Sequence, residues 1–126
     1  MRNAGFFGLV AVVAVIFAAS HRQERWHPTA LDGDTFIRAG THYRLQGLDA
    51  PELPGHCRRG RHCASGDPWA SRRGLQAELS RGISCVEHGQ DHYGRTLVRC
   101  QTAEGNDLSQ TLINQGLAQP YSYKGR

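Results

Sequence analysis

The sequence has no CxxC pair, although it contains four cysteines. Structural zinc sites in small proteins usually include such closely spaced ligands, so this absence argues against a zinc-bound fold. No internal repeat or low-complexity tract follows the first twenty residues, which argues against a repeat architecture. With 126 residues, the chain has room for one domain at most.

No apolar run reaches the roughly 20 residues that a membrane-spanning helix usually needs. The longest run covers residues 5–19, follows Arg2 and ends at the small residues Ala18, Ala19 and Ser20. This order of charge, apolar core and small residues is typical of a secretory signal peptide. We therefore expect residues 1–20 to be a signal peptide and the protein to be secreted or periplasmic. The alternative is a membrane anchor formed by residues 5–19.

Export changes the expected role of the cysteines. Outside the cytoplasm, an even number of cysteines usually indicates disulfides rather than thiol chemistry. Of the three pairings that four cysteines allow, we favour a Cys57–Cys63 bond that closes a small loop and a Cys85–Cys100 bond across two strands. The rival interpretation is a zinc site formed by His56, Cys57, His62 and Cys63.

The chain also lacks a strong excess of either charge. It has 15 lysines and arginines against 11 acidic residues, and removal of Arg2 with the signal leaves a net charge of +3. Several arginines gather in residues 58–61 and at Arg72 and Arg73. This modest excess suits a polyanionic partner. The charge alone is equally explained by a solvated basic face.

Periodicity and turn signals predict one domain over residues 26–126, preceded by a linker at 21–25. The expected elements are strands at 26–31, 35–39 and 42–48, a helix at 68–80, strands at 83–87 and 95–101, and a helix from about 107 to 116. Gly40-Thr41 is the expected hairpin turn, and Trp69 or Ala70, Leu75 and Leu79 form the expected buried side of the first helix. This order suits a small, twisted five-stranded barrel with a helix inserted between strands three and four.

Four carboxylates lie at the two ends of "DGDTFIRAGTHYRLQGLDAPE", residues 32–52. Asp34 and Asp49 come from the ends of different strands, and a hard divalent cation such as calcium prefers oxygen ligands of this kind. Such a cation would cancel the local negative charge and bridge to a phosphate. The alternative is that Asp32 and Asp34 only cap a turn.

Further groups fit phosphate chemistry. A carboxylate at Glu52, fixed after Pro51, can orient or deprotonate a water molecule. Arg44 and Arg95 carry guanidinium groups, which match phosphate oxygens and stabilise the charge that develops in phosphodiester cleavage. Alternation along the strand places Arg44 on the face opposite Leu45. Tyr93 can contact a phosphate or stack on a base, or simply cover the barrel.

Three blocks, "DGDTF…YRLQGLDAPE", "DHYGRTL" and "LINQGLA", closely resemble the signature blocks of the thermonuclease (staphylococcal nuclease-like) family. The resemblance runs in order from Leu31 to Ala118. It implies a mainly β OB-fold barrel with two or three packed helices. It also implies a calcium-dependent endonuclease that hydrolyses DNA and/or RNA and leaves 3′-phosphates, and we expect a monomer.

The resemblance also assigns roles to residues of this chain. It implies that Arg44, Glu52 and Arg95 are catalytic. One calcium ion would be held by Asp34, Asp49 and the backbone carbonyl of Ala50. Asp32 and Thr35 would support these ligands, and the substrate would contact Tyr93, Tyr121 and Tyr123.

The chain departs from the family pattern in two places. Ile37 precedes Arg38 where the family has a polar residue before an apolar one, so we expect either an inward-facing arginine or a strand bulge. The family usually continues into a final helix after the position of "QPYSYKGR", and we expect that helix to be absent here. Two alternatives to an active nuclease therefore remain: a non-catalytic OB-fold module that binds nucleic acid, and a truncated inactive homologue.

Overall fold

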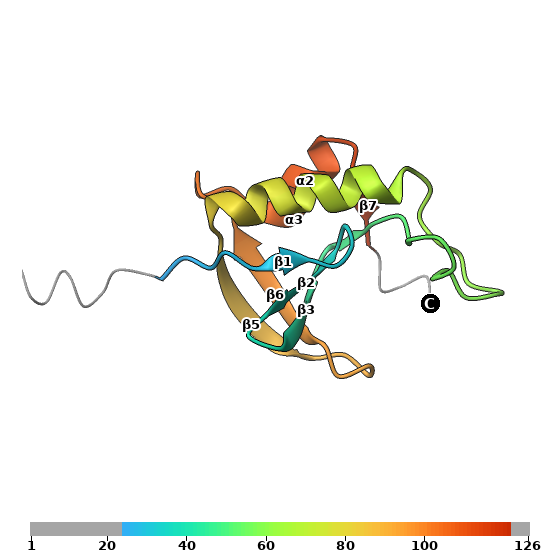
Figure 1. Ribbon diagram of the computed structural model, residues 1–126, viewed down its shortest axis with the longest axis horizontal. Coiled ribbons are helices and arrows are strands. Elements are labelled where there is room, and N and C mark those ends of the chain that lie inside the picture. The colour runs from blue at the N-terminus through green and yellow to red at the C-terminus, as the bar shows by residue number, and fades with distance from the viewer. Residues whose placement is uncertain (1–23, 122–126) are drawn as a thin grey trace, which may run out of the picture.

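The computed structural model describes residues 24–121 as a mixed five-stranded sheet, a short two-stranded sheet and two helices (Figure 1). The larger sheet has the order β1-β2-β3-β6-β5, and the smaller one pairs β4 with β7. The strands are β1 (Thr29–Ala30), β2 (Thr35–Arg38), β3 (Thr41–Leu45), β4 (Leu48–Asp49), β5 (Ser84–Gln90), β6 (Thr96–Gln101) and β7 (Gln119–Pro120). The helices are α2 (Pro68–Arg81) and α3 (Leu108–Asn114).

The hairpin of β2 and β3 turns one residue earlier than predicted. Arg38 pairs with Thr41, and the turn residues Ala39 and Gly40 both have positive φ, at 49° and 81°. Two positive φ values are typical of the type I′ turn, whose twist matches the flanking strands. The turn is therefore Ala39-Gly40, rather than Gly40-Thr41.

Strand β3 also pairs with β6, and this pairing is parallel, with Arg44 opposite Leu97. A parallel pair needs a long crossover, which here contains α2 and β5. Residues that follow the long crossover therefore lie beside β3, and Arg95, directly before β6, comes close to the strand that carries Arg44.

The first strand is shorter than predicted, with two residues instead of six. Pro28, which has no backbone N–H to donate to a sheet, directly precedes it. Further back, Trp26 forms an isolated antiparallel bridge with Ile83 just before β5. Within residues 24–121 this bridge is what connects the two edges of the sheet, so a fully closed OB barrel stays a prediction.

Helix α2 begins and ends close to the expected residues. The Asp67 side chain accepts hydrogen bonds from the backbone of Trp69 and Ala70, which satisfies two N–H groups at the helix start. Leu75 and Leu79 are fully buried, as predicted. Trp69 is 47% exposed and Ala70 is half-buried, so of the two alternatives predicted for this position Ala70 is the one nearer the buried side.

The core lies between the sheet and the two helices, which cover the same side of it in Figure 1. Its largest fully buried side chains are Phe36, Leu45, Leu48, Leu75, Leu79, Ile83, Val98, Leu108 and Leu112. Each such side chain contributes about 1.5–3 kcal/mol when it leaves water. These contacts hold β3, which carries Arg44, β4, which carries Asp49, and β6, which directly follows Arg95.

Arg38 packs on an aromatic side chain at one end of this core. Its guanidinium carbon lies 3.9 Å from the ring centroid of Trp26, and Trp26 in turn packs on Tyr43 at 5.3 Å. Cations are attracted to the face of a tryptophan ring. The departure at Ile37-Arg38 is therefore accommodated by an arginine that lies against Trp26.

Both predicted cysteine pairs lie at disulfide distance: Cys57 with Cys63, and Cys85 with Cys100. The second pair joins residues directly opposite each other on β5 and β6. None of the four cysteines remains free. Among the described residues, no group of three or more His, Cys, Asp and Glu side chains is arranged to hold a metal by itself, so the zinc interpretation has no support.

The expected signal peptide or anchor, most of the linker and Tyr123 lie outside the described residues. Between residues 24 and 121, neither helix is long and apolar enough to pass through a membrane.

Candidate active site

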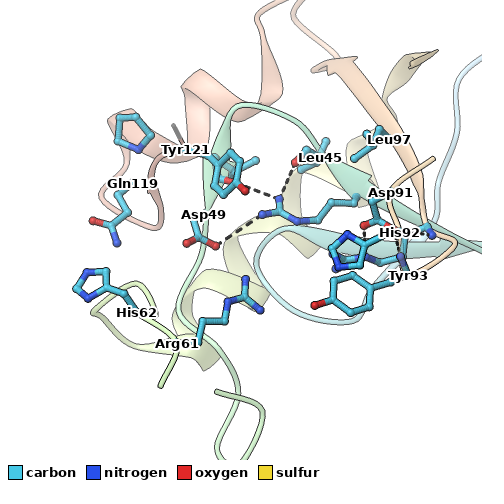
Figure 2. Close-up of a pocket in the computed structure, with 14 residues that line it drawn as sticks. Leu45, Asp49, Arg61, His62, Asp91, His92, Tyr93, Leu97, Gln119 and Tyr121 are labelled. Carbon is cyan, nitrogen blue, oxygen red and sulfur yellow. Dashed lines mark hydrogen bonds and ion pairs between the residues drawn. The ribbon is translucent and has the colours of Figure 1, made fainter. Parts of the chain in front are cut away.

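A pocket of about 820 Å³ opens beside the start of β6, the end of β3 and the β4-β7 pair (Figure 2). Its polar lining has both signs of charge. The ionisable side chains and tyrosines that line it are Arg44, Asp49, Arg61, His62, Asp91, His92, Tyr93, Arg95 and Tyr121. The pocket therefore combines Arg44, Asp49, Arg95, Tyr93 and Tyr121, five of the predicted site residues, with four that were not predicted.

Arg44 lies at the centre of the charged groups, with only 11% of its side chain exposed. Its Nη1 donates to the carbonyl oxygens of Leu45 and Leu48, at 2.6 and 3.1 Å. Its Nη2 lies 3.5 Å from Asp34 Oδ2 and 3.6 Å from Asp49 Oδ1. Both carboxylates therefore contact the same guanidinium nitrogen, and their shared binding of a cation stays a prediction.

Asp34 is tied to the segment that carries Asp49. Its Oδ2 accepts a hydrogen bond of 3.0 Å from the backbone N–H of Ala50, and its Oδ1 accepts one of 3.1 Å from the hydroxyl of Thr35. Gly33 allows this approach: a Cβ there would lie 2.6 Å from Ser71 Cβ and 2.7 Å from Ala50 Cβ. The turn therefore packs tightly against α2 and the end of β4.

Asp32 caps the turn, as one of the two alternatives predicted. Its Oδ1 accepts from the backbone N–H groups of Asp34 and Thr35 at 2.9 and 2.8 Å. Burial, the Asp34 carboxylate and, less strongly, the Glu52 carboxylate raise the pKa of Asp32 to about 7. These contacts show the capping role of Asp32, and its supporting role behind Asp34 stays a prediction.

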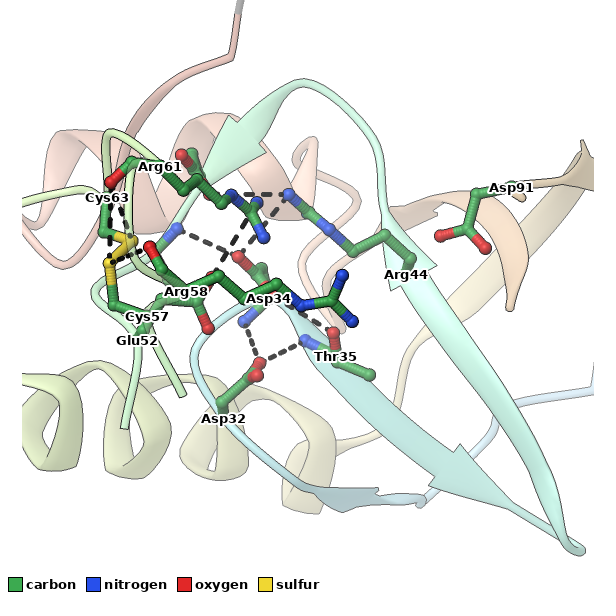
Figure 3. Close-up of polar contacts among 12 residues, drawn as sticks. Asp32, Asp34, Thr35, Arg44, Glu52, Cys57, Arg58, Arg61, Cys63 and Asp91 are labelled. Carbon is green, nitrogen blue, oxygen red and sulfur yellow. Dashed lines mark hydrogen bonds and ion pairs between the residues drawn. A yellow bond between two sulfur atoms is a disulfide. The ribbon is translucent and has the colours of Figure 1, made fainter. Parts of the chain in front are cut away.

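Glu52 lies next to these acids and faces Arg61 (Figure 3). The distance from its Oε1 to Arg61 Nη2 is 3.8 Å. Burial raises the pKa of Glu52, and the carboxylates of Asp34 and Asp49 raise it further against the opposing charges of Arg61 and Arg44. A carboxyl group with a raised pKa is a better proton acceptor near neutral pH than an ordinary glutamate.

The four acids therefore form a site with excess negative charge. The raised pKa values of Asp32 and Glu52 both result from burial and from neighbouring carboxylates. A hard divalent cation would relieve this repulsion, and carboxylate and carbonyl oxygens are the ligands it prefers. The residues present thus fit a calcium ion in their donor chemistry.

Arg95 is held at the edge of the pocket by Asp91. Its Nε donates to Asp91 Oδ2 at 2.7 Å, and its backbone N–H donates to Asp91 Oδ1 at 3.0 Å. Its Nη1 lies 3.4 Å from the hydroxyl oxygen of Thr35, which links it to the turn that carries Asp34. Tyr93 is 51% exposed, with its ring centroid 5.4 Å from the Arg95 guanidinium.

We expect Asp91→Asn to reduce stability at neutral pH but not in acid. Burial alone would raise the pKa of Asp91, but hydrogen bonds from Arg95 and the guanidinium charge outweigh it and hold the pKa below its ordinary value. The charge of Asp91 therefore stabilises the fold above its unfolded pKa, and this contribution disappears as pH falls through the lower folded pKa. Thermal melting at pH 7 should show a loss of about 1 kcal/mol or less. A deficit that stays constant below about pH 3 would contradict this account.

Sequence reasoning assigned none of four ionisable lining residues to this site: Arg61, His62, Asp91 and His92. Asp91 precedes the "HYGR" segment, and a turn aspartate of this kind accepts from backbone groups of the following residues. Arg61 and His62 lie inside the predicted Cys57–Cys63 loop. The sequence showed that this loop is basic, but it gave no sign that the loop faces the acids.

Tyr121 lies across the pocket from Arg61 (Figure 2), with its ring centroid 5.8 Å from the Arg44 guanidinium. Tyr121 thus lies beside Arg44, and its contact with substrate stays a prediction. Its neighbour in the prediction, Tyr123, lies outside the described residues.

The family model described as "Staphylococcal nuclease homologue" matches residues 42–126, about two thirds of the chain. The chain belongs to the staphylococcal nuclease homologue family. The match includes Arg44, Asp49, Glu52 and Arg95, so the family assignment and the pocket involve the same segments. It begins after the turn that carries Asp34, whose place at the site is shown by its contacts with Arg44 and Ala50.

One curated relative of this chain has a name that does not describe a nuclease. The chain is 36% identical over 92 residues to the "Succinoglycan biosynthesis protein ExoI" of Rhizobium meliloti (strain 1021). The similarity covers 71% of this chain and 48% of the relative. The chain thus matches about half the length of that protein, and the relative's name describes a biosynthesis protein rather than a nuclease.

Proposed function

We propose that this protein is a nuclease that hydrolyses phosphodiester bonds of DNA and/or RNA and leaves 3′-phosphates. One observation carries the proposal: Arg44, Asp49 and Arg95 come from separate segments of the chain and line one pocket. Asp34 contacts Arg44, and Glu52 lies beside the carboxylates of Asp34 and Asp49. Membership of the staphylococcal nuclease homologue family supports the same reaction class.

In the proposed reaction, a water molecule attacks the phosphorus atom and the bond from phosphorus to the 5′ oxygen breaks. Glu52 orients this water and accepts its proton. Arg44 and Arg95 donate hydrogen bonds to the non-bridging oxygens, whose negative charge increases in the transition state. The 5′ oxygen leaves with the bonding electron pair and takes a proton from solvent water, so the products are a 5′ hydroxyl and a 3′-phosphate. The carboxylate of Asp91 keeps Arg95 oriented for this role.

A calcium ion would be held by Asp34, Asp49 and the carbonyl oxygen of Ala50, with Asp32 and Thr35 behind them. When bound, the ion supplies positive charge that offsets the carboxylates and attracts the phosphate. Asp34 and Asp49 both contact the Arg44 guanidinium, so this side chain is placed to exchange carboxylate contacts for phosphate contacts.

Nicking of supercoiled plasmid by the purified, oxidised protein tests the proposal. We expect cleavage in the presence of calcium, loss of cleavage with excess chelator, and recovery when calcium is restored. The products should block extension by a DNA polymerase until a phosphatase removes the 3′-phosphate. The opposite result would be DNA that stays supercoiled in calcium although the protein binds it equally well with and without chelator. That result would favour a non-catalytic nucleic-acid-binding module.

A further inference from the structure

The Cys57–Cys63 disulfide closes a short loop of unusual charge. Its sequence separation is six, and the residues it encloses are Arg58, Arg59, Gly60, Arg61 and His62. The loop thus contains three arginines and no acid. A hydrogen bond of 3.1 Å from the Arg61 N–H to the Arg58 carbonyl oxygen forms a turn inside it. The disulfide and this turn therefore both restrain the backbone that carries the arginines.

One of the three arginines, Arg61, lines the pocket, and the exposed Arg58 lies beside a residue that lines it. Arg61 and His62 line it, and Figure 3 shows the disulfide and Arg61 beside Glu52 and Asp34. The Arg58 guanidinium lies 5.3 Å from the ring centroid of Tyr93, which also lines the pocket. Arg59 is exposed and does not line it. The loop therefore has a side that faces the site and a side that faces solvent.

Arg61 has hydrogen-bonding capacity that the described residues do not use. Its Nε is buried and has no hydrogen-bond acceptor between residues 24 and 121. Its contact with Glu52, at 3.8 Å, is an ion pair too long for a hydrogen bond. A guanidinium donates along a planar fork that matches two phosphate oxygens. An anion at this edge of the pocket would supply the acceptors that Arg61 lacks.

We propose that the loop closed by Cys57 and Cys63 is a second phosphate subsite, in which Arg61 and Arg58 bind a backbone phosphate next to the one that is cleaved. This inference rests on the proposed function, because it takes a polynucleotide strand to lie in the pocket. Tyr93 lies between Arg58 and Arg95, so a base or sugar between two neighbouring phosphates has an aromatic surface to contact. The favoured substrate is then a strand with several phosphates rather than a dinucleotide.

Matched arginine variants test this subsite. Arg61→Gln removes a charge that lines the pocket, Arg58→Gln removes one beside Tyr93, and Arg59→Gln removes one that is exposed and does not line the pocket. Binding of a fluorescent single-stranded phosphorothioate oligonucleotide is followed by anisotropy over a range of salt concentrations. One lost phosphate contact on a single strand should flatten the slope of log K against log salt by about 0.7. We expect this change, with about tenfold weaker binding at low salt, for Arg61→Gln and a smaller one for Arg58→Gln.

Ligand length gives a second readout. Arg61→Gln should weaken binding of a tetranucleotide but leave a dinucleotide with one phosphate nearly unaffected. The double variant Cys57→Ser/Cys63→Ser keeps all three arginines, yet it should also weaken the tetranucleotide, because the loop no longer holds them in place. Thermal melting of each variant shows that the fold is retained.

The outcomes separate this inference from the proposed function. Equal behaviour of Arg61→Gln and Arg59→Gln would overturn the subsite, even if the protein cleaves DNA. Arg61-dependent binding by a protein that cleaves neither DNA nor RNA would support the subsite and contradict the hydrolase. A dinucleotide affected as strongly as the tetranucleotide would place Arg61 at the reacting phosphate, and would also overturn the second site.

Discussion

Replacing Glu52 with glutamine should lower kcat for cleavage of DNA by about 10²–10⁴-fold, the usual contribution of a general base. Glutamine has nearly the same shape but cannot accept a proton from water. Since burial and the carboxylates of Asp34 and Asp49 raise the pKa of Glu52, the acid-side fall of wild-type activity should move to lower pH as calcium is increased, because the ion offsets those carboxylates. Initial rates on a labelled oligonucleotide measure both effects.

Glu104→Gln is the matched control for this substitution. Glu104 is an exposed glutamate whose carboxylate lies 3.1 Å from Arg81, and it does not line the pocket. The Glu104→Gln variant should keep near-normal kcat and the pH profile of the wild type. If Glu52→Gln retained most of its activity while melting like the wild type, the assignment of Glu52 as the base would be wrong.

Arg95→Ala is the second substitution with a large expected effect. Removal of one preorganised donor from a developing negative charge typically costs about 10²–10³ in kcat. The fold should change little, because the Arg95 side chain is partly exposed and its pair with Asp91 lies within a surface turn. Single-turnover rates with saturating oligonucleotide, combined with thermal melting, separate loss of catalysis from loss of structure.

Arg99→Ala provides the corresponding control from the following strand. Arg99 lies on β6, is 52% exposed and pairs with Asp107 rather than with the pocket. Arg99→Ala removes one positive charge, as Arg95→Ala does, and should change the single-turnover cleavage rate by less than severalfold. Equal losses for Arg95→Ala and Arg99→Ala would mean that net charge, and not a specific guanidinium, governs cleavage.

The sequence predicted most of the fold because its local signals agree. Asp67-Pro68 marks the start of α2 and Asp107 that of α3, since each aspartate accepts from backbone N–H groups of the first turn. Alternation in β3 correctly placed Arg44 opposite the buried faces of Tyr43 and Leu45. The sequence could not decide between Trp69 and Ala70 on the buried side of α2. Spacing from Leu75 does not determine whether a large ring near a helix end reaches the core.

The candidate site was predicted only in part, because long-range pairing decides it. Arg44, Asp34 and Asp49 were expected near one another, and the structure places them together. Arg61 was not expected there. Its approach to Glu52 depends on how the loop after Pro51 folds back, which no periodicity or motif describes. The Cys57–Cys63 pairing was the one local clue that this loop has a defined shape.

The parallel pairing of β3 with β6 has a consequence for the stage of folding at which the candidate active site forms. Arg44 and Arg95 flank a crossover that contains a whole helix and a strand, and contacts between such distant segments form late and cooperatively as a chain folds. A nascent or partly unfolded chain has the same guanidinium groups but not their convergence. Hydrolysis of nucleic acid would then appear only with native topology, so turnover would report completed folding.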